Sequence, residues 1–301
     1  MRDEGGGKPA AIVDAINAVF GKQQRNRAIH AKGIVLTGRF VPDRAAVELT
    51  RAPHLQQAPS EVIARFSNFS GNPATSDVDM TASPRGLALR FRLDERAYTD
   101  LVMHSFDGFP AATADEFRAL LVALGSDRAE LFLREHPRAR AFLEAHQPPP
   151  VSWATLRYFG VNSFAFTNAA GRKRYGRYRA EPIAGEHFLS GEATAHVGPD
   201  YLREEIAARV AAEPVRFVLR VQLAGEGDRI EDPSVAWPAN RATVELGTVA
   251  LDRVVGFGDA VEGPLLFSPS MVTEGIATAD PMLGVRDAAY VVSFERRHSG
   301  R

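Results

Sequence analysis

The sequence predicts an α+β fold built from many antiparallel strands. Segments in which apolar and polar residues alternate occur on both sides of a central helical stretch. Most helical patterns are grouped in that stretch or near the two ends of the chain, so they do not alternate one by one with strands as in a parallel sheet. Hydrophobic residues make up 45% and charged residues 24% of the 301 residues, a composition typical of globular proteins.

The composition also excludes several classes of site. The chain contains no cysteine, which rules out disulfides, thiolate-bound zinc, iron–sulfur clusters, a cysteine nucleophile and a haem held by cysteine. Its formal net charge of −1 argues against a general nucleic-acid-binding protein. No apolar run reaches the roughly 18 residues of a membrane span, and residues 1–7 lack the apolar run of a secretory signal. We therefore expect a cytoplasmic protein that neither binds nucleic acid nor spans a membrane.

The first elements in the chain are a helix and three strands. Ile12 begins an i, i+3, i+4, i+7 apolar stripe that indicates an amphipathic helix over residues 10–20, and Gly21 provides its stop. From Leu87 to Arg92 apolar residues hold the odd positions and mostly polar residues the even ones. This period of two predicts strands over residues 33–41, 62–67 and 86–93.

A helical stretch comes next. Thr113 and Glu116 have the spacing of a capping box, and Ser126 is placed to begin a further helix. The stretch ends near Gln147, before the prolines at 148–150, which are the strongest helix breaker in the chain. Strand patterns lie on both sides of these prolines. We therefore interpret them as a connection within one domain, the alternative being a linker between two domains.

A second β region follows, and a helix closes the chain. Ala170 and Gly171 form a hairpin turn between two of its strands. Asp280 and Pro281 have the residue types of a helix N-cap and first helical position, so a last helix is expected from Pro281 to about Val292. The other elements predicted in this region are strands over residues 159–167, 175–180 and 215–223 and a helix over residues 201–212.

Two groups of residues indicate chemistry. Arg286 and Tyr290 are four residues apart on the last predicted helix, which brings the guanidinium beside the phenol oxygen. A neighbouring cation favours the phenolate, which is an anionic ligand for ferric haem iron. His30 stands before the first predicted strand, three residues after Arg27. Taken singly, an Arg–Tyr pair is more often a surface contact and a lone histidine an ordinary core or surface residue.

Seven segments resemble motifs of the haem catalase superfamily, in the same order along the chain. They are residues 27–33 (RAIHAKG), 65–67 (RFS), 83–91 (SPRGLALRF), 100–102 (DLV), 160–168 (GVNSF to Asn168), 232–238 (DPSVAWP), and 267–270 (FSPS) leading to Arg286-x-x-x-Tyr290. The short chain is most similar to the small catalase-related peroxidases. The resemblance implies a closed antiparallel β-barrel of the catalase type, with helical insertions, haem b as cofactor and a C-terminal helix that carries the haem ligand.

The resemblance also implies a role for each matching residue. Tyr290 would be the axial ligand of the haem iron and Arg286 its charge partner. His30 would be the distal acid and base, and Ser67 would orient its ring. The remaining cofactor contacts implied are Arg27, Arg65 and Arg297 with the haem propionates, Ile29 and Phe66 beside the porphyrin, and Phe117 over the distal pocket.

The sequence departs from the family pattern on the distal side. The family places an asparagine there, whereas direct alignment puts His104 at that position and a shifted alignment offers Asp107. Neither side chain is an amide, so the second contact to peroxide is expected to be weak. Only about 25 residues precede the His30 segment and the chain stops soon after Tyr290, which leaves out the arms of full-length catalases. We therefore expect an accessible haem edge and a homo-oligomer, either a dimer or a loose tetramer.

We expect one catalase-like haem domain over residues 1–301. Its parts are an N-terminal helix (1–24), the first barrel half with the distal haem side (25–110), a helical insertion (111–150), the second barrel half (151–267), and the proximal haem helix with its tail (268–301).

The expected function is a haem-dependent peroxidase that reduces hydrogen peroxide or organic hydroperoxides with a small organic electron donor, and that has weak or no catalase activity. Three alternatives share the same residues: a low-activity catalase, a haem-binding or sensing protein, and an enzyme of catalase fold that rearranges hydroperoxides. A haem-free barrel, in which His30 and Tyr290 are ordinary core residues, is a further alternative.

Overall fold

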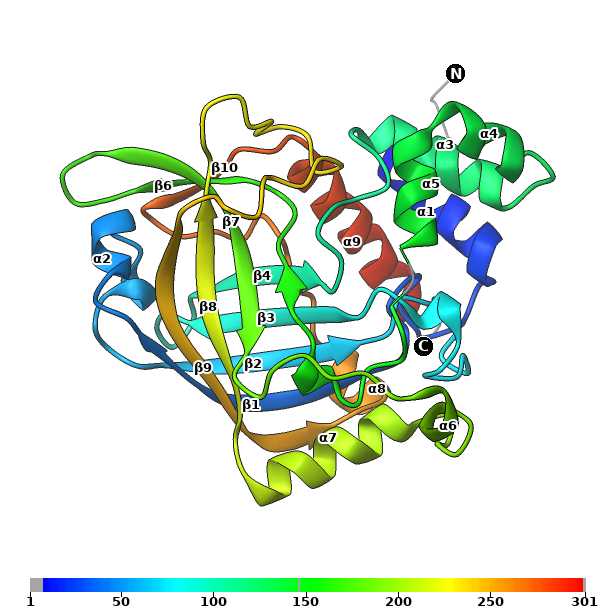
Figure 1. The fold of residues 1–301 in the computed structure, drawn as a ribbon, viewed down its shortest axis with the longest axis horizontal. Helices are drawn as coiled ribbons and strands as arrows, with labels where there is room; N and C mark the ends of the chain where they lie inside the picture. Colours follow the sequence, from blue (N-terminus) through cyan, green and yellow to red (C-terminus); the bar gives the residue numbers. More distant parts are fainter. Residues whose placement is uncertain (1–7, 146, 300–301) are drawn as a thin grey trace.

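The computed structural model describes residues 8–145 and 147–299. Residues 1–7, which include the start of the segment expected over 1–24, lie outside the described residues, as do 146, 300 and 301. An antiparallel β-barrel forms the body of the described chain (Figure 1). Its strands are β1 (Gly33–Pro42), β2 (Ser60–Ser67), β3 (Gly86–Arg92), β4 (Tyr98–His104), β5 (Tyr158–Phe159), β7 (Lys173–Pro182), β8 (Val215–Leu223) and β9 (Thr243–Gly256).

The barrel is closed by the pairing of β7 with β8. The strand order is β7-β5-β4-β3-β2-β1-β9-β8, and β8 pairs antiparallel with β7 from Leu223 opposite Gly176 to Phe217 opposite Pro182. The structure therefore confirms the closed antiparallel barrel. Two further strands, β6 (Phe164–Thr167) and β10 (Ile276–Thr278), extend the sheet beside β7.

The expected single strand over residues 159–167 is in fact two strands. β5 pairs with both β4 and β7, whereas β6 pairs with β7 and β10. The break at residues 160–163 coincides with Gly160, whose N–H donates to the carbonyl of Tyr178 outside the regular ladder. The backbone thus changes its partners within one apolar run, which the alternation of residues does not reveal.

Large aromatic side chains fill the barrel interior. Phe66, Trp153, Tyr158 and Phe217 are buried together, and the ring of Phe66 stacks on that of Trp153 with centroids 6.1 Å apart. Successive residues of a strand face opposite sides of the sheet. Each strand that gives such a residue to the interior therefore presents its neighbours to the outside of the barrel.

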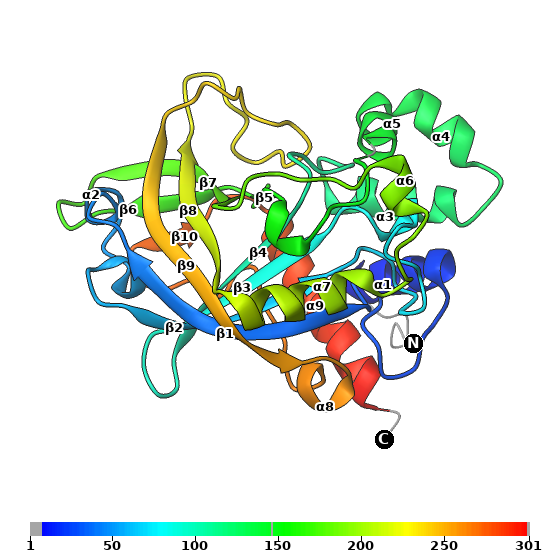
Figure 2. The same ribbon diagram turned by 60° about the horizontal axis from the view of Figure 1, so that its bottom comes forward.

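Helices cover the barrel on its outside. One group lies at one side of the barrel, with α9 running between the barrel and α1 (Figure 1). This group consists of α1 (Lys8–Phe20), α3 (Ala114–Leu124), α4 (Ala129–Glu135), α5 (Pro137–Glu144) and α9 (Met282–His298). A separate helix, α7 (Tyr201–Ala212), packs along β9 (Figure 2). The short helices are α2 (Ala46–Leu49), α6 (Gly191–Thr194) and α8 (Asp259–Glu262), with 3-10 turns at Pro53–Leu55, Met80–Ala82 and Trp153–Thr155.

Local signals determine where two of these helices begin. The hydroxyl of Thr113 accepts the N–H of Glu116 and caps α3, as the capping-box spacing predicts. The carboxylate of Asp280 accepts the N–H of Met282 at 2.9 Å and begins α9. This last helix continues to His298, beyond the expected end near Val292. Within the described ranges, the helices are all too short or too polar to cross a lipid bilayer.

Candidate functional site

A cavity lies outside the barrel, between the ends of β2, β3 and β4 and the helix α9. It encloses about 1320 Å³ of space between protein atoms, its open mouth included, and its lining is mostly apolar. Ten of the twelve site residues expected from the sequence line it: Arg27, Ile29, His30, Arg65, Ser67, His104, Phe117, Arg286, Tyr290 and Arg297. Residues separated by up to 270 positions in the sequence thus meet around one space.

Phe66 does not line the cavity, contrary to the expectation that it borders a porphyrin. Its neighbours Arg65 and Ser67 face the cavity, and the period-two alternation of β2 turns Phe66 to the opposite side. There it is fully buried against Trp153 in the barrel core.

Asp107 also lies away from the cavity. Its carboxylate pairs with the guanidinium of Arg179 at 2.9 Å. His104 lines the cavity instead, so only one of the two candidates for the distal asparagine position is at the site.

One row of residues across four strands orders the distal wall. Gly33, Ser67, Gly86 and His104 stand directly opposite one another on β1, β2, β3 and β4. Residues opposite one another on neighbouring strands face the same side of the sheet. Ser67 and His104 therefore point into the same space, with Gly86 between them.

Gly86 makes room for the imidazole of His30. A Cβ atom at this position would lie 2.6 Å from the Oγ of Ser67 and 3.0 Å from the ring of His30, closer than side chains tolerate. The sequence contained Gly86 within a matching motif, but only the pairing of the strands reveals what its missing side chain does.

His30 is held in a rare backbone conformation with its ring tied to Ser67. Its φ of 58° lies in the left-handed region, and its Nδ1 is 3.1 Å from the Oγ of Ser67. The ring also packs edge-on against Phe69, with centroids 5.5 Å apart. Burial, reinforced by the positive charge of Arg65, lowers the pKa of His30 to about 3. The imidazole is therefore neutral at neutral pH and able to accept a proton.

His104 presents an unpaired ring nitrogen. Its Nδ1 accepts the N–H of Phe106 at 3.3 Å, so the proton of the neutral ring resides on Nε2. That Nε2 atom is buried and has no hydrogen-bond partner among residues 8–145 and 147–299. Burial, together with the charge of Arg286, lowers the pKa of His104 to about 3, which keeps the ring neutral. The ring packs edge-on against Phe142 of α5, a contact that no sequence signal indicated.

The wall formed by α9 carries Arg286 and Tyr290, one helical turn apart. The Nη2 of Arg286 donates to the hydroxyl oxygen of Tyr290 at 2.9 Å, and its Nη1 donates to the Oδ1 of Asn162. Asn162 in turn donates to the carboxylate of Asp280 at 2.7 Å. The tyrosine oxygen therefore lies against a positively charged group that is itself held in place, and it is directed into the cavity.

Three arginines form the polar edge of the cavity, and Glu262 pairs with one of them. Arg65 donates to Glu262 at 2.5 Å, and Arg27 and Arg297 each donate to the carbonyl of Leu265, at 2.8 and 2.7 Å. Burial lowers the pKa of Arg297 to about 10, with repulsion from Arg65 as the second cause. The cavity lining at this edge is thus positively charged, which suits a ligand with carboxylate groups. The Nε of Arg297 is buried and unpaired among the residues described, so it too has room for an acceptor.

Comparison with known proteins relates nearly the whole chain to catalases and catalase-related peroxidases. A family model described as Catalase matches residues 11–300. The chain is 37% identical to a Catalase-related peroxidase of Mycolicibacterium paratuberculosis, covering 97% of this chain and 96% of that protein. It is 29% identical to a Catalase-related peroxidase of Synechococcus elongatus, covering 97% of this chain and 89% of that protein. It is 27% identical to Catalase-2 of Bacillus subtilis, but spans only 42% of that longer protein.

Solved structures show the same fold. A bacterial catalase superimposes with a TM-score of 0.80 at 21% identity, covering 92% of this chain and 58% of the other. A fungal catalase superimposes with a TM-score of 0.80 at 19% identity, covering 92% and 60%. Together with the match of the family model from residue 11 to residue 300, these similarities show that the chain belongs to the catalase family.

Proposed function

We propose that the chain binds haem b in this cavity, with Tyr290 as the axial ligand, and reduces peroxides at the expense of a small organic electron donor. The single observation that carries the proposal is that one cavity is lined both by an arginine-bonded tyrosine and by a neutral, hydroxyl-bonded histidine. Family membership implies haem, and two of the relatives are named catalase-related peroxidases.

The residues of the cavity fit haem b. The apolar lining suits a porphyrin face, and Tyr290 supplies an anionic oxygen ligand. Arg27, Arg65 and Arg297 would bind the two propionates, because all three guanidinium groups line the same edge of the cavity. When bound, haem supplies the redox-active iron at which the O–O bond of a peroxide is cleaved.

His30 would move the proton. Its Nδ1 is occupied by Ser67, which leaves Nε2 for the substrate. The neutral ring accepts a proton from one peroxide oxygen as a general base and delivers it to the other as a general acid. Because the pKa of His30 is about 3, this base form is available throughout the neutral and mildly acidic range.

His104 would donate a hydrogen bond from Nε2 to a peroxide oxygen. Its tautomer is fixed by the N–H of Phe106, so it offers one donor at this atom. A histidine in place of the family's amide is the reason for expecting weak catalase activity, since dismutation requires a second peroxide to be held well.

We infer a cytoplasmic homo-oligomer, a dimer or loose tetramer, whose haem edge is accessible to the organic donor.

The experiment that tests the proposal combines a visible spectrum with two activity measurements. The purified, haem-loaded protein is expected to show a Soret band that changes when peroxide is added, and to oxidise an organic donor faster than it evolves oxygen. Oxygen evolution with negligible donor oxidation would indicate a catalase instead. An unchanged Soret band would indicate a haem-binding or sensing protein, and conversion of an organic hydroperoxide without a donor would indicate a rearranging enzyme.

A further inference from the structure

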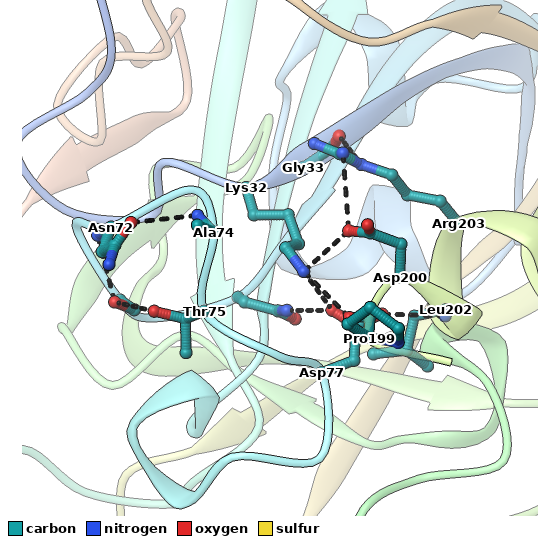
Figure 3. A network of polar contacts seen from close by, with 12 residues as sticks. Lys32, Gly33, Asn72, Ala74, Thr75, Asp77, Pro199, Asp200, Leu202 and Arg203 are labelled. Atoms are coloured by element: carbon teal, nitrogen blue, oxygen red, sulfur yellow. Dashed lines mark hydrogen bonds and ion pairs between the residues drawn. The ribbon is translucent and has the colours of Figure 1, made fainter. Parts of the chain in front are cut away.

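Asp77 is a buried carboxylate that binds three separate parts of the chain (Figure 3). Its Oδ1 accepts from the Nζ of Lys32 at 3.2 Å and from the Nδ2 of Asn68 at 2.6 Å. Its Oδ2 accepts from the backbone N–H of Leu202, in the first turn of α7, at 2.9 Å. Asp77, Lys32 and Asn68 do not line the cavity, so this cluster cannot touch a substrate there.

The cluster nevertheless adjoins the distal wall at three points. The carbonyl of Asp77 accepts from the Nη2 of Arg85 at 2.5 Å, just before β3, while the carboxylate binds Lys32 just before β1 and Asn68 just after β2. Each partner is next to a distal residue in the sequence: Lys32 is two residues after His30, Asn68 is one residue after Ser67, and Arg85 is one residue before Gly86. One aspartate is thus bonded next to three residues of the distal side, His30, Ser67 and Gly86.

His30 needs such support because its backbone is strained. A residue other than glycine is uncommon in the left-handed region and persists there only where its surroundings hold it. The backbone after His30 is paired with the chain after Ser67 through three hydrogen bonds: His30 N–H to Phe69 O at 2.9 Å, Ala31 N–H to Ser70 O at 3.0 Å, and Asn68 N–H to Lys32 O at 3.0 Å. The side chains of Lys32 and Asn68, one from each side of this pairing, bind the same carboxylate oxygen.

We propose that Asp77 is a positioning residue, which holds the imidazole of His30 against Ser67 and Gly86 for proton transfer. The proposal rests on the proposed peroxidase function. When the carboxylate loses its charge, Lys32 and Asn68 are no longer held together, and His30 is free to leave the left-handed conformation. Its ring then turns away from Ser67.

The chain provides a matched control in Asp200. This carboxylate also pairs with the Nζ of Lys32, at 2.8 Å, but its side chain is half-exposed, and it forms a second ion pair with Arg203 on α7 at 3.8 Å. Asp200→Asn therefore removes a charge from the same lysine while leaving the bonds of Asp77 to Asn68 and Arg85 in place. Asp77→Asn removes the charge that joins the distal segments and keeps the shape of the side chain.

The test is a double-mutant cycle on the haem-loaded protein. Asp77→Asn is expected to lower peroxide turnover by about 10–100-fold at unchanged haem content, as the loss of a supporting residue does elsewhere. Asp200→Asn is expected to change it by less than about twofold. In a His30→Ala background, Asp77→Asn is expected to cost less than about twofold, because its effect passes through His30. Equal losses in both backgrounds, or no loss in either, would overturn the proposal.

A second measurement does not depend on activity. In the unloaded protein, ¹⁵N NMR of the His30 ring should show its Nδ1 hydrogen bond in the parent and in Asp200→Asn, but not in Asp77→Asn. A His30 spectrum unchanged by Asp77→Asn would contradict the positioning role. If the parent protein has no peroxide turnover, the proposed function fails, yet this spectrum still tests the position of the ring. If Asp77→Asn does not fold, Asn68→Ala removes one arm of the cluster, keeps the Lys32–Asp77 pair, and is expected to loosen the His30 ring in the same spectrum.

Discussion

Arg286 donates a hydrogen bond to the hydroxyl oxygen of Tyr290 at 2.9 Å, across one turn of α9. The guanidinium is fixed in turn by Asn162, which is bonded to Asp280 at the start of the same helix. A charged donor held from both sides cannot follow the tyrosine if that residue moves. The pair therefore presents to the cavity a phenol oxygen whose hydrogen-bond donor is fixed.

Tyr290→Phe is expected to abolish tight haem binding, because it removes the oxygen that would bind the iron. The loss of affinity should exceed the roughly 10–100-fold that removal of a supporting residue costs. Arg286→Gln, which removes only such support, should fall within that range. Haem titration followed by absorbance measures both, and Tyr175→Phe, at a half-exposed position on β7, is the control. Unchanged haem affinity in Tyr290→Phe would refute the ligand assignment.

Gly86→Ala is expected to leave haem content unchanged and lower peroxide turnover by about 100-fold, since a displacement of about 1 Å can have that effect. The added Cβ would lie 3.0 Å from the His30 ring and would push it from its place. The control is Gly284→Ala on α9, where a Cβ meets open space and a helix gains up to about 1 kcal/mol of stability. Equal turnover in the two variants would show that the His30 ring has more room than its contacts indicate.

His104→Phe is expected to leave the stability of the fold nearly unchanged and to impair the reaction. The substitution removes a buried N–H that has no partner among the residues described, a group that costs about 1–3 kcal/mol, but it also leaves the N–H of Phe106 without its acceptor, so the two effects offset each other. It also removes the donor to peroxide, which should lower turnover by about 100-fold or more. His104→Asn restores an amide donor and should retain more turnover than His104→Phe. Denaturation midpoints and steady-state rates of the two variants test this, and full turnover in His104→Phe would rule out the donor role.

Acid is expected to destabilise the protein through its buried histidines. Burial lowers the pKa of His30 and His104 to about 3 and that of His54 to about 4, from 6.5. Below pH 6.5 these three histidines are therefore protonated in the unfolded chain but remain neutral in the folded chain. The free energy of unfolding is highest above this pH and is lost as the pH falls toward 4. Each histidine contributes about 1.4 kcal/mol per pH unit, so the three together give about 4 kcal/mol per unit between pH 6 and 4.5.

Chemical denaturation at several pH values measures this slope. His54→Phe, whose ring replaces one already packed against Phe40 and Phe91, should reduce the slope by about 1.4 kcal/mol per pH unit. The same slope in the parent and in His54→Phe would show that His54 does not contribute, and a constant stability from pH 7 to 4.5 would contradict the account for all three.

The sequence predicts the strands whose alternation is uninterrupted. β2 and β3 agree with the expected ranges to within two residues, and α7 agrees at both ends. The long strand β9 was not expected, because Gly247 has a φ of 142° and sits at a register shift opposite Leu219, which breaks the alternation. The strand β4 is not predicted either, because it contains Asp100, a charged residue that a buried strand position rarely holds. The structure buries this carboxylate because Arg90 donates two hydrogen bonds to it, each 2.7 Å long.

Among the site residues, spacing along the sequence predicts a side-chain contact only on α9. Arg286 and Tyr290 are joined by the helical repeat itself, so four residues of spacing predict their contact. The distal side depends on the register of paired strands, and a change of one residue decides whether Phe66 faces the cavity or the core. The role of Asp77 depends on segments brought together by the fold, so no pattern in the sequence around it indicates that role.

The register of one row of residues limits where insertions and deletions can be tolerated. This row consists of Gly33, Ser67, Gly86 and His104. Deleting one residue within β2 would turn every later side chain of that strand to the opposite face, so the hydroxyl of Ser67 would point into the barrel core. The turn after β3 at residues 93–97 lies at the far ends of β3 and β4 and leaves the row intact. Homologues and engineered variants should therefore accumulate insertions in that turn and preserve the residue count between it and the cavity.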